Sequence, residues 1–153
     1  MKRRVFVPVI FAALMALTAA VPVHAAEPTV IDVWSCDRSG GEYRVGRRSH
    51  TTLFYGWLTK ARRQAVKFLD RSYVELTIDG MPVANADLLW SRPIQLDENL
   101  WAVLWVYELG RLGAGNSIDT NLKLIFTESH WDGFSTYPPG TYEDLDCRVF
   151  TRA

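Results

Sequence analysis

The sequence predicts a mainly β fold, an antiparallel β-sandwich with one short inserted α-helix. Three observations lead to this prediction. About seven short segments carry strand-like alternation or β-branched and aromatic residues, with turn signals between them at intervals of about ten residues. Only one segment has helical spacing, whereas a doubly wound α/β fold would need several crossover helices. Two cysteines, Cys36 and Cys147, lie near the two ends of the chain that follows the N-terminal apolar run.

Residues 1–25 are predicted to be an export signal. Lys2, Arg3 and Arg4 precede an almost wholly apolar run from Val5 to Val23, and Val23-His24-Ala25 offers small residues for cleavage. Residues 26–153 would then form a single domain. No second apolar span follows, so we expect a secreted or periplasmic product without a membrane span.

The charge balance of the exported product argues against nucleic-acid binding. The signal holds three of the 17 Lys and Arg residues and none of the 17 Asp and Glu residues. Its removal leaves a net charge of about −3 when the histidines are neutral. General nucleic-acid binding calls for a basic surface, so that class of function is excluded.

Export also decides what the two cysteines do. In an oxidising compartment we expect Cys36 and Cys147 to form a disulfide that joins the first and last strands. A metal site or a catalytic thiol would need companions, and the sequence has no CxxC pair and no histidine close to either cysteine.

The first half of the domain predicts two strands and the helix. Strands are expected over Thr29–Cys36 and His50–Trp57. Helical spacing over Thr59–Asp70, with Thr59 as N-cap, predicts the helix. Its polar side carries Lys60, Arg63 and Lys67, and positive charge at a helix start opposes the macrodipole. These residues are therefore a solvated face, paired with acids, or available to a partner.

A hairpin follows the helix. Tyr73–Ile78 alternates as a strand, Asp79-Gly80 is a strong hairpin turn, and the return strand contains Pro82, which belongs at a sheet edge. Weaker strand patterns cover Leu88–Trp90 and Pro93–Leu96.

The second half predicts the interior of the fold. Both faces of Leu100–Leu109 are apolar, which is typical of a central strand. Ile118–Phe126 alternates as a half-buried strand. His130–Thr141 is expected to be a loop, and Asp146–Thr151 the closing strand.

Several short motifs resemble those of secreted bacterial immunoglobulin-like domains of uncharacterised exoproteins. They are Tyr55-Gly56-Trp57 followed by Lys60, Arg62 and Phe68-Leu69, the Ile78-Asp79-Gly80 hairpin, and Leu112-Gly113-Ala114-Gly115 before an alternating strand. The similarity covers about Leu53 to Cys147 and implies an immunoglobulin-like architecture without catalytic residues. The short Cys-to-Trp-to-Cys spacing of antibody domains is absent.

Catalytic and metal signatures are weak, and no cofactor is predicted. A zinc site would need His50 and His130 to come together, and Ser129 beside His130 lies in no GxSxG turn. The better-supported ion is calcium, with oxygen ligands among four carboxylates. These metal candidates are Asp132, Glu143, Asp144 and Asp146.

Aromatic residues are the stronger functional signal. Trp90 and Trp131 lie in polar, turn-rich segments, where exposed rings together with Tyr137 would offer a rigid contact area. We therefore expect a non-enzymatic binding or structural domain that recognises a surface glycan or protein through loop aromatics. One alternative is an inhibitor of a secreted protease or lysozyme that inserts the loop of residues 130–141. Another is a small metal-dependent hydrolase.

Overall fold

The computed structural model describes residues 28–152, so the predicted export signal lies outside the described residues. Most of this part is β-structure, with two α-helices and one 3-10 helix. The strands are β1 (Thr29–Asp32), β2 (Glu42–Val45), β3 (His50–Thr59), β4 (Ser72–Ile78), β5 (Met81–Pro82), β6 (Ile94–Asp97), β7 (Leu100–Arg111), β8 (Ser117–Phe126), β9 (His130–Trp131), β10 (Thr136–Tyr137) and β11 (Gly140–Thr151). The helices are α2 (Val33–Arg38), α3 (Arg62–Arg71) and the 3-10 helix η1 (Ala86–Leu89).

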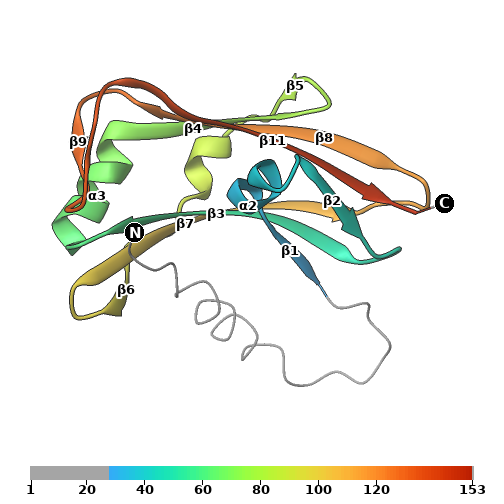
Figure 1. Ribbon diagram of the computed structural model, residues 1–153, viewed down its shortest axis with the longest axis horizontal. Helices are drawn as coiled ribbons and strands as arrows, with labels where there is room; N and C mark the ends of the chain where they lie inside the picture. The colour runs from blue at the N-terminus through green and yellow to red at the C-terminus, as the bar shows by residue number, and fades with distance from the viewer. Residues whose placement is uncertain (1–27, 153) are drawn as a thin grey trace.

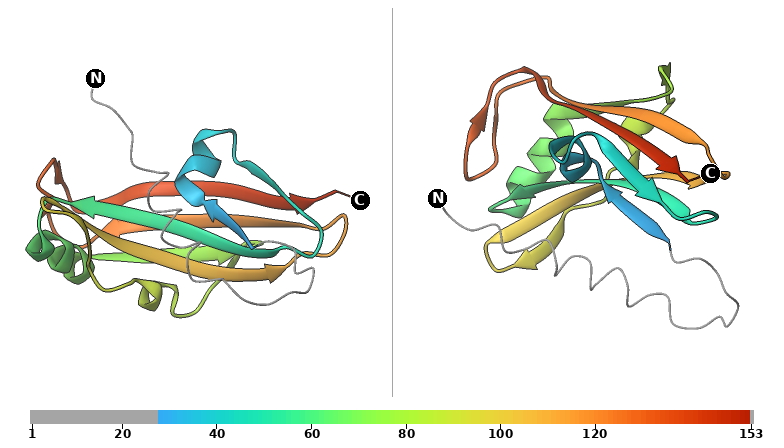
Figure 2. Two further views of the ribbon diagram at one scale, coloured as in Figure 1. Left: turned by 90° about the horizontal axis from the view of Figure 1, so that it is seen from below. Right: turned by 45° about the vertical axis from the view of Figure 1, so that its right-hand side comes forward.

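Two sheets lie one above the other in two layers (Figure 1). One has the strand order β1-β3-β7-β6 and the other β2-β11-β8-β4-β5, while β9 and β10 form a separate ribbon. Seen from below, α2 lies along one long edge, η1 along the opposite edge and α3 at one end (Figure 2).

The prediction of purely antiparallel sheets is wrong, because both sheets are mixed. β1 pairs in parallel with β3, and β2 pairs in parallel with β11. Parallel neighbours need a crossover connection rather than a tight hairpin. The chain between β1 and β3 provides one by passing through α2 and β2.

The sequence predicted one α-helix, and the structure has a further one, α2, earlier in the chain. The expected strand from Thr29 ends at Asp32, whose side chain accepts hydrogen bonds from the Trp34 N–H at 3.1 Å and the Ser35 hydroxyl at 2.7 Å. An N-cap of this kind starts a helix, and helical spacing then buries Val33 and Cys36 on one side. The disulfide between Cys36 and Cys147 is confirmed. It joins α2 to β11, so the expectation that it links two strands is corrected.

The predicted helix over residues 59–70 is present as α3, but it begins later. Thr59 belongs to β3, and its hydroxyl donates to the Ala61 carbonyl instead of capping the helix. Ala65 and Phe68 form the buried side of α3.

The hairpin prediction is confirmed. Asp79 and Gly80 have φ values of 50° and 75°, as a type I′ turn requires, and Pro82 lies in the edge strand β5. Leu88–Trp90, however, is not a strand, since most of it belongs to η1. The central position of β7, between β3 and β6, is as predicted.

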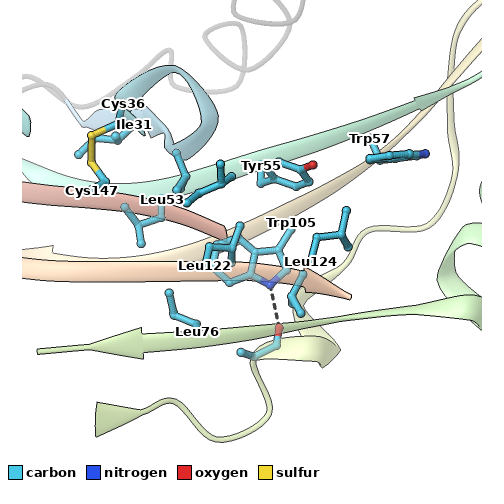
Figure 3. Packing of buried hydrophobic residues seen from close by; sticks show 14 of the residues in the cluster. Ile31, Cys36, Leu53, Tyr55, Trp57, Leu76, Trp105, Leu122, Leu124 and Cys147 are labelled. Atoms are coloured by element: carbon cyan, nitrogen blue, oxygen red, sulfur yellow. Dashed lines mark hydrogen bonds between the residues drawn. A yellow bond between two sulfur atoms is a disulfide. The ribbon is translucent and has the colours of Figure 1, made fainter. Parts of the chain in front are cut away.

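The core lies between the two layers. Leu53 and Tyr55 reach into it from one sheet, and Leu122 and Leu124 from the other (Figure 3). At its centre Trp105 is fully buried, and its indole N–H donates to the Ala86 carbonyl of η1 at 2.7 Å. In Figure 3 the disulfide lies at one end of the labelled core residues and Trp57 at the other. Among the helices of residues 28–152, none combines the length and apolar character that crossing a membrane would need.

Candidate binding surface

A short hairpin lies beside α3 (Figure 1) and carries two exposed aromatic residues. It consists of β9, a turn over residues 132–135, and β10, and we call it the Asp132 hairpin. Trp131 is 53% exposed and Phe134 is 51% exposed. Exposed apolar area that is concentrated on one element marks a contact surface more often than a single exposed residue does.

Asp132 fixes the shape of this hairpin. Its side chain is 4% exposed and accepts hydrogen bonds from the N–H groups of Phe134 and Ser135, at 2.6 and 2.8 Å. The hydroxyl of Tyr137 donates to the second carboxylate oxygen at 2.9 Å. An aspartate that bonds to backbone N–H groups two and three residues ahead makes a local turn that holds its own conformation.

The turn also packs directly onto the start of α3. The Lys60 N–H donates to the Asp132 carbonyl at 2.9 Å. Gly133 has φ +98°, and a Cβ atom at this position would lie 2.6 Å from Lys60 Cβ and 2.8 Å from Gln64 Oε1. Only glycine fits such a contact, so the backbone of the hairpin is in close contact with α3.

Beneath the hairpin lies a cluster of aromatic rings. His130 stacks on Phe126 at 5.6 Å between ring centroids, and Tyr137 stacks on Phe126 at the same distance. Trp57 contacts Tyr137 edge to face at 4.9 Å and stacks on Phe68. These contacts hold both strands of the hairpin against the core.

His130 is buried without a hydrogen bond. It is 1% exposed, and neither ring nitrogen has a partner among the described residues. Burial lowers the pKa of this imidazole, and the charges of Arg71 and Lys67 act in the same direction, while Asp132 opposes them. Burial thus favours the neutral form of this ring, which packs against Phe126 and Phe68.

Positive charge lies beside one of the exposed rings. Lys60 Nζ lies 5.1 Å from the ring centroid of Phe134, a cation–π contact. Lys60, Arg62, Arg63 and Lys67 are exposed, and none of them forms an ion pair within residues 28–152. The basic start of α3, which we define as Lys60, Arg62, Arg63 and Lys67, is thus a solvated face whose first residue lies beside Phe134.

The predicted aromatic residues occupy three different environments. Trp131 is exposed on the hairpin, and Tyr137 is half-buried and supports it through Asp132. Trp90 packs edge to face against Phe68 at 5.0 Å and against Tyr55 at 6.2 Å, so it lines the core. Burial also raises the pKa of the Tyr137 phenol, and its hydrogen bond to Asp132 adds to that rise.

The sequence did not single out Phe134 or Lys60 as parts of one surface. The available signal was the Asp132-Gly133 pair, which is typical of a tight turn and places Trp131 just before the turn and Phe134 within it.

The carboxylates proposed as calcium ligands have other partners. Asp132 is occupied within the hairpin, and Glu143 lies 3.9 Å from Arg38. Asp144 and Asp146 both accept from the Asn121 side-chain amide. Within residues 28–152, no three His, Cys, Asp or Glu side chains are grouped to hold a metal ion.

His50 and His130 lie near opposite ends of β3. His50 is the first of its 10 residues, and Lys60, directly after the strand, bonds to the hairpin that contains His130. At about 3.3 Å per residue the strand is roughly 30 Å long, so the histidines cannot share a site.

Comparison with known proteins adds no further constraint. No family model, curated protein or solved structure matches this chain.

Proposed function

We propose that this chain is an exported, non-enzymatic binding domain that takes an acidic glycan across the Asp132 hairpin. The observation that carries the proposal is the pair of half-exposed rings, Trp131 and Phe134, on a hairpin whose turn is fixed by a buried carboxylate. Rigid rings offer large contact area at low cost in conformational entropy, and their flat faces suit the apolar faces of sugar rings.

The basic start of α3 favours an acidic ligand. Lys60 lies beside Phe134, and Arg63 and Lys67 are exposed on α3 without an ion pair within the described residues. Carboxylates or sulfates along a glycan would meet these charges while the sugar rings contact Trp131 and Phe134. Charge of this kind raises the association rate and makes binding sensitive to salt.

The setting of this domain is part of the same proposal. A disulfide is typical of oxidising compartments, which supports export by residues 1–25 to the periplasm or the medium. We also infer that the two facing sheets form a β-sandwich, and that its relation to immunoglobulin-like domains is one of architecture.

Calorimetric titration with hexagalacturonate tests the function. The wild type is compared with a Trp131→Ala/Phe134→Ala variant and with Leu88→Ala as the matched control, because Leu88 is 75% exposed on η1. Loss of two contact rings at about 1 kcal/mol each predicts roughly 30-fold weaker binding, and the control should bind like the wild type.

The neutral oligosaccharide cellohexaose separates the roles of rings and charges. Arg63→Gln/Lys67→Gln should weaken binding of hexagalacturonate and leave any binding of cellohexaose unchanged. Equal binding by the wild type and the double-ring variant would refute the proposal. If neither sugar binds and an extracellular protein binds through Trp131, the protein-binding or inhibitor alternative would be favoured instead.

A further inference from the structure

The outer face of the four-stranded sheet is apolar where a solvent-facing sheet would be polar. The strand register places the pairs Phe54–Val106, Gly56–Leu104 and Leu58–Ala102 on this face, and Ile94 lies beside Ala102. Leu58, Val106 and Ile94 are each 40% exposed. None of these register pairs contains a charged residue.

Gly56 leaves the centre of this face without a side chain of its own. A Cβ atom at Gly56 would lie 3.4 Å from Phe54 Cζ and 3.6 Å from Leu104 Cδ2. The side chains of Phe54 and Leu104 therefore border the backbone of Gly56. A glycine within a strand is a place where another surface can approach the backbone closely.

The other sheet of the same molecule gives the contrast. Its outer face carries the ion pair between Lys123 and Asp144 at 3.5 Å and that between Arg148 and Asp119 at 2.6 Å. Sheets with one face in water alternate apolar and polar residues in this way. Since only the sheet β1-β3-β7-β6 departs from the rule, its outer face has the composition of a covered surface.

We propose that a second copy of this chain covers the apolar face, so that two protomers pack with these sheets face to face. The uncharged centres of two identical faces can pack together without electrostatic repulsion. A strongly charged partner would instead call for opposite charges on this face. The four strands β1, β3, β7 and β6 have 4, 10, 12 and 4 residues. At about 4.8 Å between strands and about 3.3 Å per residue, the face measures roughly 480 Å² in projection.

That area fits a weak, reversible interface. A standard interface takes about 800 Å² of accessible surface from each partner, with an apolar centre and a polar rim. Asp32 lies beside Phe54 on the edge strand β1, and Glu108 lies opposite Thr52, toward the start of β3; both would belong to the rim. We therefore expect a reversible dimer whose population rises with protein concentration.

Sedimentation equilibrium of the exported protein, from micromolar to millimolar concentration, tests the proposal. The wild type should pass from monomer to dimer, and Val106→Lys should weaken the dimer at least tenfold. Leu58→Lys, on the neighbouring strand, is the second variant in case the first does not fold, as judged by near-ultraviolet circular dichroism. Leu88→Lys on η1 is the matched control and should dimerise like the wild type.

Three results would overturn the proposal. One is a wild-type monomer at every concentration. Another is a dimer that neither Val106→Lys nor Leu58→Lys weakens. The third is a monomer that cosediments with phosphatidylcholine vesicles through Val106, which would assign the face to lipid. The Asp132 hairpin lies outside this face, so hexagalacturonate binding by Val106→Lys should be unchanged and reports on the proposed function separately.

Discussion

Replacement of Asp132 by alanine should release the binding hairpin without unfolding the domain. The substitution removes three hydrogen bonds to a buried carboxylate, from Phe134 N–H, Ser135 N–H and the Tyr137 hydroxyl. Hydrogen bonds to a charged group contribute about 1.5–3 kcal/mol each, but the two turn N–H groups recover part of this from water. We therefore expect a total loss of about 2–4 kcal/mol in the free energy of unfolding, against a typical domain stability of roughly 5–15 kcal/mol.

Urea unfolding and amide hydrogen exchange measure this effect at two levels. The unfolding midpoint should fall, and the amides of Phe134 and Ser135 should lose protection to a greater extent than amides in β7. Asp132→Asn keeps an acceptor oxygen for the two N–H groups and should lose only about 1 kcal/mol.

Asp144→Ala is the matched control for Asp132→Ala. Asp144 is an exposed carboxylate whose partners, Asn121 and Lys123, lie at the surface, so its loss should change stability by less than about 0.5 kcal/mol. Unchanged protection of the Phe134 and Ser135 amides in Asp132→Ala would refute the role assigned to this carboxylate.

Three further predictions concern stability. Burial lowers the pKa of His130, so the unfolded chain takes up a proton on this residue at a higher pH than the folded chain does. The free energy of unfolding should therefore be at its full value above about pH 6.5 and fall below that pH. His130→Phe should remove this part of the pH dependence of the melting temperature. The disulfide closes a loop of 111 residues, and the Cys36→Ala/Cys147→Ala variant should lose about 4–5 kcal/mol in urea unfolding, whereas an unchanged midpoint would contradict its stabilising role. Gly133→Ala should lower the melting temperature more than Gly140→Ala does. Both glycines have positive φ, but of the two only Gly133 has neighbours within 4 Å of an added Cβ atom. Equal losses would count against the close packing of the hairpin on α3.

Local patterns predicted the elements whose burial is decided by their own residues. Leu100–Leu109 is apolar on both faces, which predicted a central strand, and the segment lies in β7 between β3 and β6, although Val106 on its outer face is 40% exposed. Asp79-Gly80 predicted its turn because few residue pairs accept two positive φ angles.

The pairing of β1 and the start of α2 could not be predicted in the same way. β-Branched residues around Asp32 favour a strand, yet the cap made by its side chain starts a helix, and the burial of Cys36 depends on its distant partner Cys147. Parallel pairing of β1 with β3 is equally a matter of long-range packing, which no local pattern of Thr29–Asp32 encodes.

The candidate surface was only partly predicted, and the reason is similar. Trp90 and Trp131 lie in segments of similar polarity, so composition cannot separate the ring that packs on Phe68 from the ring that stays in water. Asp132 was interpreted as a candidate metal ligand, and its contacts make it the anchor of the hairpin. Recognition of that role needs the positions of Phe134 and Tyr137, which only the fold provides.

The indole N–H signals of the tryptophans in a nitrogen–proton correlation spectrum, recorded during titration with hexagalacturonate, give the most direct measurement. Trp131 is exposed on the hairpin, while Trp57 and Trp105 are buried, so each reports on its own region. The account predicts that the Trp131 signal shifts with ligand concentration and that those of Trp57 and Trp105 stay in place. A saturable shift of another indole with Trp131 unchanged would contradict it.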